Sequence, residues 1–490
     1  MKRLIGWSLA ATGLTIAIVA ILVWRAFTPP NPLQPTSTAF TLDNVTVINP
    51  GDSRRERQRI TVNSETIQSI APASAPASGA LQTYSGMYVL PGLADMHAHL
   101  PPKNPLKLSS YFLLLNLAYG VTSIRDAGDL DDTSLNGRRE AAADGYPSPR
   151  VFPCGPFVSA GARKWANTVI LESPADADKV AATLKANGSH CLKAYDGLTL
   201  AMVDALREAT RKHGLRMIGH VPEGLTYEKA LIPDTQHLMG VTDPADQKPD
   251  HRLALTQGWD RVDDARLEAI VKATKQSGIA NTPTLVYDQQ ILRLEKYDEA
   301  RRSPEALLLP RVFRDVVWNP KEGIPGYRNM TPAEFDGVRF AQDKKLRLTR
   351  MLYEAGTQLY LGTDVQQPFT SPGISLHQEM RQFAKSGIPT EAIWKLATSD
   401  AGKSLGLTGL GTLAAGAPAD FLIFRNDPTK DLAALDSLEA VVAQGRLYTK
   451  ASIDAKIAEY QAHYSGFIVD RLSVVLGRAA LRKISATDSH

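Results

Sequence analysis

The sequence predicts an α/β protein: a (β/α)8 barrel, a small β-sandwich built from the segments that flank the barrel, and an N-terminal transmembrane helix. Three observations lead to this prediction. Short apolar stretches alternate with helical patterns over residues 91–407, period-2 alternation of apolar and polar residues occurs on both sides of that region, and a long uncharged run lies near the N-terminus. The 490 residues suffice for two or three domains.

The uncharged run extends from Leu4 to Trp24, and its 21 residues can cross a hydrocarbon core of roughly 30 Å as a helix. A secretory signal has a shorter apolar region, about 7–15 residues, and a small-residue cleavage site. We therefore expect residues 1–28 to be an uncleaved membrane anchor, with a cleaved signal peptide as the alternative. Because Lys2 and Arg3 precede the run, the catalytic part is expected in the periplasm or otherwise outside the cytoplasm.

Patterns after the anchor divide the rest of the chain. Residues 29–37 are rich in proline and predict an extended linker. Strand patterns occupy residues 38–90 and return at residues 408–450, and these two segments most simply form one small β-sandwich that the barrel interrupts. Residues 451–490 have a helical pattern, and we expect this tail to pack on its own domain, with membrane contact as the alternative.

The middle region, residues 91–407, contains about eight strand candidates, which is typical of a (β/α)8 barrel. Val121–Arg125, Leu192–Tyr195 and Met217–His220 are examples of these strands. A doubly wound sheet is the alternative, but no Gly-x-Gly-x-x-Gly motif follows the first strand.

Composition excludes several classes of protein. The formal net charge is +4, and Lys2, Arg3 and Arg25 supply three of these charges, so the remainder is nearly neutral. It lacks the basic stripe of a nucleic-acid binder. Two cysteines, Cys154 and Cys191, are too few for a disulfide scaffold or a Cys-based zinc finger. We expect both to be free buried thiols, although an oxidising compartment would permit a bridge.

The sharpest local signal is the pair His97 and His99. Residues i and i+2 of a strand share a face, so both imidazoles can point to one metal ion. Taken alone, the pair also fits two surface or core histidines. Metal-competent residues recur, however, at the ends of later predicted strands: Lys193, His220, His237 and Asp364. In a parallel barrel all of these open onto the face where active sites lie.

This order of residues resembles the metal-dependent amidohydrolase superfamily, and within it the imidazolonepropionase-like and Xaa-Pro dipeptidase-like group. The likeness covers about residues 38–450. The stretches that carry it are residues 192–197, 219–224, 362–364, 372–379 and 411–421.

The resemblance implies two divalent metal ions, most simply Zn²⁺. The ligands it implies are His97, His99 and Asp364 for one ion, His220 and His237 for the other, and Lys193 between them. Lys193 would bridge the ions after its amine takes up CO₂ and becomes a carboxylate. This is chemically reasonable, because burial disfavours the charged ammonium and leaves a neutral amine. A hydroxide between the ions would attack a carbonyl carbon, and Asp364 would pass the hydroxide proton to the leaving nitrogen.

Three residues are candidates for contact with substrate. His377 lies in the family-like stretch after the eighth strand, and we expect it either to start a helix or to line the substrate pocket. Tyr195 can touch substrate, although a strand aromatic is more often a packing residue. Many relatives carry a Gly-Gly-His segment after the third strand, but residues 157–164 lack it. Arg163 is the candidate to attract a substrate carboxylate there, with an exposed basic residue as the alternative.

Two further features bear on the pocket. Arg125 and Asp126 end the second strand and are expected either to form an ion pair that shapes the pocket or to be structural. The segment 288–358 is longer than an ordinary connection and is a candidate helical lid.

The sequence therefore predicts a metal-dependent hydrolase of an amide, cyclic amide or dipeptide C–N bond, acting on a small molecule or a short peptide. The lysine favours a two-metal hydrolase over a one-metal deaminase. A hydrolase of lactones, esters or phosphotriesters on the same scaffold is an alternative, and so is a metal-free binding protein. Assembly into a homo-oligomer is compatible with the sequence.

Overall fold

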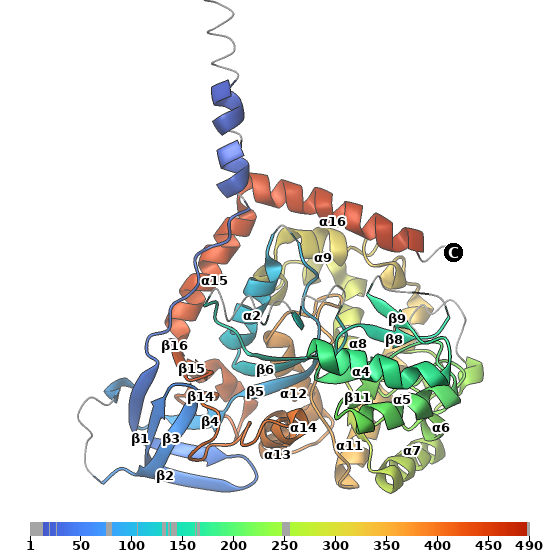
Figure 1. Cartoon of the computed structure of the whole chain (residues 1–490), viewed down its shortest axis with the longest axis horizontal. Coiled ribbons are helices and arrows are strands. Elements are labelled where there is room, and N and C mark those ends of the chain that lie inside the picture. Colours follow the sequence, from blue (N-terminus) through green and yellow to red (C-terminus); the bar gives the residue numbers. More distant parts are fainter. Residues whose placement is uncertain are drawn as a thin grey trace, which may run out of the picture.

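A computed structural model describes residues 13–487 apart from residues 19, 26, 75–80, 105, 130–133, 136–137, 139–144, 162, 164–166 and 247–254. Figure 1 shows a β-sheet unit beside a larger α/β body, with a helix near the N-terminus projecting from one end. Ten of the 21 residues of the expected membrane-crossing run, residues 4–12 and residue 19, lie outside the described residues. Within the described part of the chain, no helix combines the length and the apolarity needed to cross a membrane.

The β-sheet unit is one seven-stranded sheet to which both flanking segments contribute. Its strands are β1 (Ala39–Asn49), β2 (Ser53–Asn63), β3 (Thr66–Pro72), β4 (Tyr88–Pro91), β14 (Phe421–Phe424), β15 (Leu438–Ala443) and β16 (Arg446–Thr449), in the order β16-β15-β14-β4-β1-β2-β3. Strand β4 joins the two segments, because it pairs in parallel with β1 and antiparallel with β14. Phe40, Ile60 and Ile423 belong to a hydrophobic core of this unit's own.

The α/β body contains two sheets of parallel strands. The first has the order β5 (Leu93–Ala98), β6 (Val121–Asp126) and β7 (Arg150–Pro153). The second has the order β13 (Ala280–Thr282), β12 (Asp234–Gln236), β11 (Arg216–Gly219), β10 (Cys191–Ala194), β8 (Phe157–Ser159) and β9 (Thr168–Ile170). Their hydrophobic residues belong largely to one core with the surrounding helices.

The two sheets meet at both of their ends, so that the strands follow one another in a ring. The contacts at the two junctions are too few to make the ring a continuous β-sheet. The segment 358–365 lies between β13 and β5, where Tyr360 N donates to Asn281 O and Met96 N donates to Leu361 O, both at 2.9 Å. Only isolated bridges are formed there. On the other side, His190 N donates to Pro153 O at 2.6 Å, which places the start of β10 beside the end of β7.

Cys154 and Cys191 form a disulfide at this second junction, so the prediction of free thiols is wrong. Cys154 follows β7 directly, and Cys191 begins β10. The two cysteines are 37 positions apart in the sequence. Their pairing depends on which strands become neighbours, and strand periodicity alone does not contain that information.

The helices of the body lie around the parallel strands (Figure 1). They are α2 (Leu108–Ala118), α4 (Ala177–Asn187), α5 (Leu200–Lys212), α6 (Tyr227–Ala230), α7 (Asp264–Ser277), α8 (Leu285–Leu292), α9 (Tyr297–Ala300), α10 (Pro304–Leu308), α11 (Pro332–Glu354), α12 (Ile374–Lys385), α13 (Thr390–Lys395) and α14 (Ala401–Leu405). Local sequence explains their boundaries: α11 begins at a capping box of Thr331 and Glu334 with Pro332 in the first turn.

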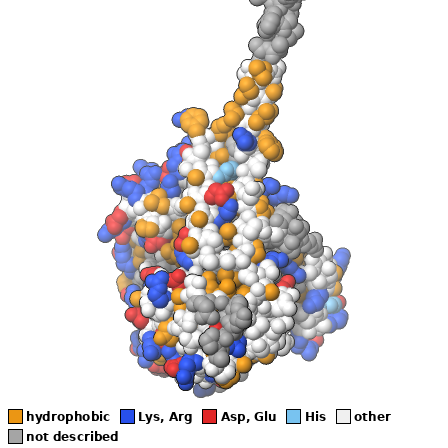
Figure 2. Space-filling view, turned by 90° about the vertical axis from the view of Figure 1, so that its left-hand side faces the viewer, with side chains coloured by type: hydrophobic (Ala, Val, Ile, Leu, Met, Phe, Trp, Pro, Cys, Tyr) orange, Lys and Arg blue, Asp and Glu red, His pale blue; other side chains and the backbone are white. Residues whose placement is uncertain are grey.

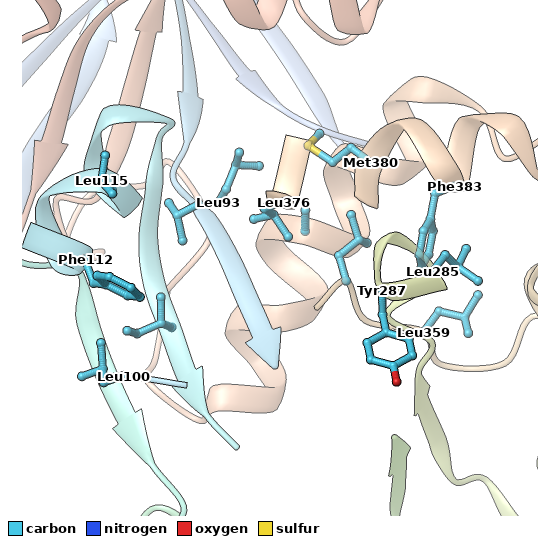
Figure 3. Packing of buried hydrophobic residues seen from close by; sticks show 14 of the residues in the cluster. Leu93, Leu100, Phe112, Leu115, Leu285, Tyr287, Leu359, Leu376, Met380 and Phe383 are labelled. Atoms are coloured by element: carbon cyan, nitrogen blue, oxygen red, sulfur yellow. The ribbon is translucent and has the colours of Figure 1, made fainter. Parts of the chain in front are cut away.

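Helices α8 and α12 pack together through apolar side chains. Figure 3 shows Leu285 of α8 beside Phe383 of α12, with Met380 nearby, and the Tyr287 hydroxyl pointing away from these residues. Glu379 of α12 strengthens the contact by accepting hydrogen bonds from the backbone N–H groups of Leu285 and Val286 at 3.0 and 2.6 Å. The first turn of α8, which follows strand β13, is therefore held in place.

The C-terminal tail forms α15 (Lys450–Ser465) and α16 (Phe467–Thr487). Helix α15 packs on α2, where the Tyr111 and Tyr460 rings stack with centroids 5.0 Å apart. Tyr464 adds a hydrogen bond from its hydroxyl to the Leu106 carbonyl at 3.1 Å. The chain that precedes β1 returns to the body at Phe27, which is half-buried against the main core.

Candidate metal centre

Four imidazoles, a carboxylate and an amine meet beside the carboxyl ends of the parallel strands. They belong to His97 and His99 at the end of β5, Lys193 in β10, His220 after β11, His237 after β12, and Asp364 in the segment 358–365. Parallel neighbours bring their carboxyl ends to the same edge, which explains how residues so distant in sequence come together.

The distances define a compact site. Asp364 Oδ1 lies 3.4 Å from His97 Nε2 and 3.2 Å from His99 Nε2. Ligand atoms of His97, His237 and Asp364 all lie within 4.8 Å of one another. The ring of His237 lies 4.5 Å from that of His97 and 5.1 Å from that of His220, measured between centroids. A single ion can therefore be reached by several of these groups.

Hydrogen bonds fix the orientation of three of the imidazoles through Nδ1. His99 Nδ1 donates to the Gly128 carbonyl at 2.9 Å, because a carbonyl can only accept. His237 Nδ1 lies 2.7 Å from the Thr284 hydroxyl, which donates its own hydrogen to the Pro283 carbonyl and so accepts from the histidine. His97 Nδ1 lies 2.6 Å from Gln236 Oε1. When an imidazole held in this way is neutral, its Nε2 carries the lone pair that binds a metal ion.

Behind His97 lies a buried polar network that sequence patterns did not reveal. Gln236 Nε2 donates to Asp234 Oδ1 at 2.8 Å, and Arg125 Nη2 forms an ion pair with Asp234 Oδ2 at 2.6 Å. Of the two alternatives for Arg125 and Asp126, the ion pair between them does not form, because Arg125 pairs with Asp234. Consecutive residues of a strand point to opposite faces, and Asp126 instead accepts from the backbone N–H of Leu100 at 3.0 Å.

Close backbone packing brings Asp364 to His97. A Cβ atom on Gly362 would lie 2.7 Å from His97 Cβ, so this approach requires glycine. Asp364 has a φ of 53°, in the left-handed region, and its N–H donates to the His97 carbonyl at 2.8 Å. Asp95 braces the same junction by accepting from the Thr363 hydroxyl at 2.6 Å. The residues between Gly362 and Asp364 thus hold the carboxylate over the first pair of histidines.

Burial sets the protonation states of the site. It lowers the pKa of His97 to about 3 and that of His220 to about 4, so both imidazoles are neutral near pH 7. Burial opposes ionisation of Asp364, but His97 and His99 outweigh it and hold the pKa of the carboxyl well below its usual value. Burial also lowers the pKa of Lys193 to about 7. Burial also opposes a charge on His99, but Asp364 outweighs it and raises the pKa of that imidazole. The set therefore offers the neutral imidazoles of His97 and His220 beside an ionised carboxylate.

These residues fit a divalent metal ion. The amine of Lys193 is buried and, among the described residues, has no hydrogen-bond partner. Such a group is costly unless something else satisfies it. Neutral imidazoles with oriented Nε2 atoms around a carboxylate are the donor set that Zn²⁺ and similar ions prefer.

The amidohydrolase family model matches residues 88–448. The chain belongs to the amidohydrolase family. It is a metal-dependent hydrolase. A search of the curated proteins gives no match.

Solved structures of low sequence identity share the fold of this amidohydrolase. The bottromycin amidohydrolase AH has a TM-score of 0.68 and 22% identity, with 90% of this chain and 92% of that chain covered. A Xaa-Pro dipeptidase with bound methionine has a TM-score of 0.63 and 17% identity, covering 84% and 100%. The A. niger ochratoxinase has a TM-score of 0.59 and 14% identity, covering 84% and 96%.

The three candidate substrate residues lie in different surroundings in this amidohydrolase. Tyr195 is half-buried, and its ring lies 4.4 Å from that of His220 and 4.8 Å from that of Phe157, so it lines the site. His377 lies in α12, where its Nε2 is 2.7 Å from the Tyr119 carbonyl at the end of α2. Arg163 is exposed between β8 and β9.

Two tyrosines reach the amidohydrolase site without a recognisable sequence signal. The Tyr287 ring lies 6.3 Å from the His237 ring, and its hydroxyl is 3.0 Å from that of Tyr327. The Tyr327 hydroxyl lies 2.7 Å from Gln367 Oε1, three residues beyond Asp364. Tyr327 belongs to the long segment 288–358, so part of that segment borders the metal site. Only its folded course could reveal this contact.

Proposed function

We propose that this amidohydrolase hydrolyses the C–N bond of an amide, a cyclic amide or a dipeptide. The observation that carries the proposal is the ligand set at one end of the parallel strands, in which every residue is buried except the half-buried His99: His97, His99, Lys193, His220, His237 and Asp364. The fold is shared with a bottromycin amidohydrolase and a Xaa-Pro dipeptidase, which supports amide-type substrates. We take the interrupted ring of parallel strands to be a (β/α)8 barrel.

The proposed centre holds two divalent ions, most simply Zn²⁺. His97, His99 and Asp364 would hold one ion, and His220 and His237 would hold the other. Lys193 would serve both ions as a carboxylate formed with CO₂, a reaction that needs the neutral amine favoured by its lowered pKa of about 7. When bound, such ions polarise a carbonyl group and supply an activated water at neutral pH.

A side chain of the protein accepts the proton of the attacking water and delivers it to the leaving group. Asp364 is ionised and lies over the histidine pair, so it can accept the proton of the attacking water. It then delivers that proton to the leaving nitrogen, which departs as a neutral amine. Tyr195 borders the His220 side of the site and can pack against the substrate.

We also propose that residues 1–28 anchor the enzyme in a membrane, with the catalytic domain outside the cytoplasm. The apolar run Leu4–Trp24 and the charges of Lys2 and Arg3 support this location. The disulfide of Cys154 and Cys191 supports it independently, because disulfides persist in oxidising compartments. Alkaline extraction of membranes and the mass of the mature chain test it: a soluble, shortened chain would mean signal cleavage.

Metal analysis combined with a substrate screen tests the proposed activity. The purified enzyme, loaded with Zn²⁺, should hold about two ions per chain and hydrolyse members of a panel of dipeptides and N-acyl amino acids. His97→Ala serves as a matched variant that should lose metal and activity together. Less than one ion per chain under metal-replete conditions would overturn the two-metal centre. If only lactones were hydrolysed, the enzyme would instead be a hydrolase of ester bonds.

A further inference from the structure

Helix α16 crosses the end of the body from which the N-terminal helix projects (Figure 1). The described part of that N-terminal helix ends near Trp24, and Phe27 packs half-buried against the body. If the preceding apolar run lies in a membrane, this end of the body faces the membrane surface. The inference below rests on that proposed anchoring.

The outer side of α16 exposes apolar side chains. Phe467 is 73% exposed and Val475 is 62% exposed, whereas Val469, Ser473 and Leu481 are buried against the body. At about 100° per residue, the three buried side chains fall within one third of the helix circumference, and Phe467 and Val475 fall outside that sector. Figure 2 shows apolar side chains along the N-terminal helix, with Lys and Arg side chains near its base.

The same helix is basic. Residues 467–487 include four basic residues and one acidic residue, a net charge of +3. A groove of about 540 Å³ runs between α16 and residues 297–319. Four arginines and a single acidic residue supply its charged lining: Arg301, Arg311, Arg471, Arg478 and Asp315.

Not all of this charge is neutralised within the protein. Arg311 forms an ion pair with Asp470 at 2.6 Å, and Arg478 forms one with Glu322 at 3.2 Å. Arg471 differs, because its guanidinium lies over the Phe467 ring, 4.5 Å from the centroid. Among the described residues it has no carboxylate within ion-pair distance. Arg471 therefore presents an unneutralised cation beside an exposed aromatic ring.

We propose that α16 and its arginine-lined groove form a membrane-contact surface that rests on anionic phospholipid headgroups beside the anchor. The apolar side chains enter the headgroup boundary, and the unneutralised Arg471 meets lipid phosphates. A second copy of this chain fits the surface less well, because it would bring an identical basic helix against this one. The contact would hold the catalytic body in one orientation relative to the membrane.

A fluorescent label on α16 tests the contact in the full-length chain. Both native cysteines are in the disulfide, so Val475→Cys introduces the only free thiol for an environment-sensitive dye. Gln276→Cys is the matched control, because Gln276 is exposed and belongs to α7. Helix α7 lies at the opposite end of the body in Figure 1. Each labelled protein is reconstituted into vesicles of phosphatidylcholine, with or without phosphatidylglycerol.

The emission at position 475 should shift to the blue with phosphatidylglycerol and be quenched by a lipid-soluble quencher, whereas that at position 276 should not change. Arg471→Gln in the labelled background should lower the ratio of lipid-seated to exposed label about fivefold.

Three results would overturn the inference or its basis. A chain removed from vesicles by alkaline washing would disprove the anchoring itself. A retained chain whose label at position 475 stays water-exposed in both lipids would disprove only the α16 contact. A blue shift without lipid that grows with protein concentration would assign the surface to a second copy of the chain.

Discussion

Gln236 Oε1 lies within hydrogen-bond distance of His97 Nδ1, at 2.6 Å, although the two residues are 139 positions apart in the sequence. The amide of Gln236 cannot rotate freely, because its Nε2 donates to the backbone and side-chain oxygens of Asp234 at 2.9 and 2.8 Å. Its Oε1 must therefore face His97 and accept from Nδ1. This single contact selects the tautomer whose Nε2 is free to bind a metal ion.

Gln236→Met should weaken metal binding by about 10–100-fold, because the His97 ring would lose its orienting acceptor. Competition with a chelator measures the affinity. Gln382→Met provides a matched control, since Gln382 is a buried glutamine in α12 that bonds to Gln289 at 2.8 Å. Equal metal affinities for both variants would contradict the orienting role.

Asp364→Asn should lower kcat by about 10²–10⁴-fold, because an amide cannot accept and release the proton. Asparagine tolerates the left-handed φ of 53° at this position, so the backbone should remain in place. Metal content measured on the same sample distinguishes two causes of lost activity: normal metal content indicates loss of the proton carrier, and lowered metal content indicates loss of a metal ligand. Full activity with normal metal content would exclude Asp364 as the proton shuttle.

The double variant Cys154→Ala/Cys191→Ala should unfold with a free energy about 4 kcal/mol lower, because the bridge closes a loop across 37 positions. Denaturant titration measures this difference. A strong reductant should destabilise the native enzyme and leave the variant unchanged. Titration of two free thiols in the unreduced native enzyme would show that the bridge does not form.

Acid should destabilise the enzyme partly through His377, whose burial lowers its pKa to about 4 from an ordinary 6.5. The unfolded chain binds this proton first, so the stability contribution is present above pH 6.5 and is lost as the pH falls toward 4. The loss amounts to about 3 kcal/mol. In His377→Gln, which keeps a donor for the Tyr119 carbonyl, unfolding free energy should depend less on pH over that range. Parallel curves for both proteins would refute this linkage.

Residue patterns predicted the parts of the fold that depend on local periodicity. Alternation near residues 40–48 and 419–424 corresponds to β1 and β14, and the six metal-competent residues come together at the strand ends. The state of Cys154 and Cys191 was predicted wrongly, and the partner of Arg125 was not predicted. Both depend on which strands become neighbours in the folded chain.

The sequence by itself determined which chemical groups this protein can bring to a metal site, because strand ends in a parallel α/β fold open on one side. Only the tertiary structure decided what surrounds those groups: Gln236 behind His97, Tyr327 beside Tyr287, and the disulfide between β7 and β10. The physical reason is that a side chain's rotamer and partners follow from long-range packing. Periodicity along one segment specifies which face of a strand or helix is buried. It does not specify which residue of another segment packs against that face.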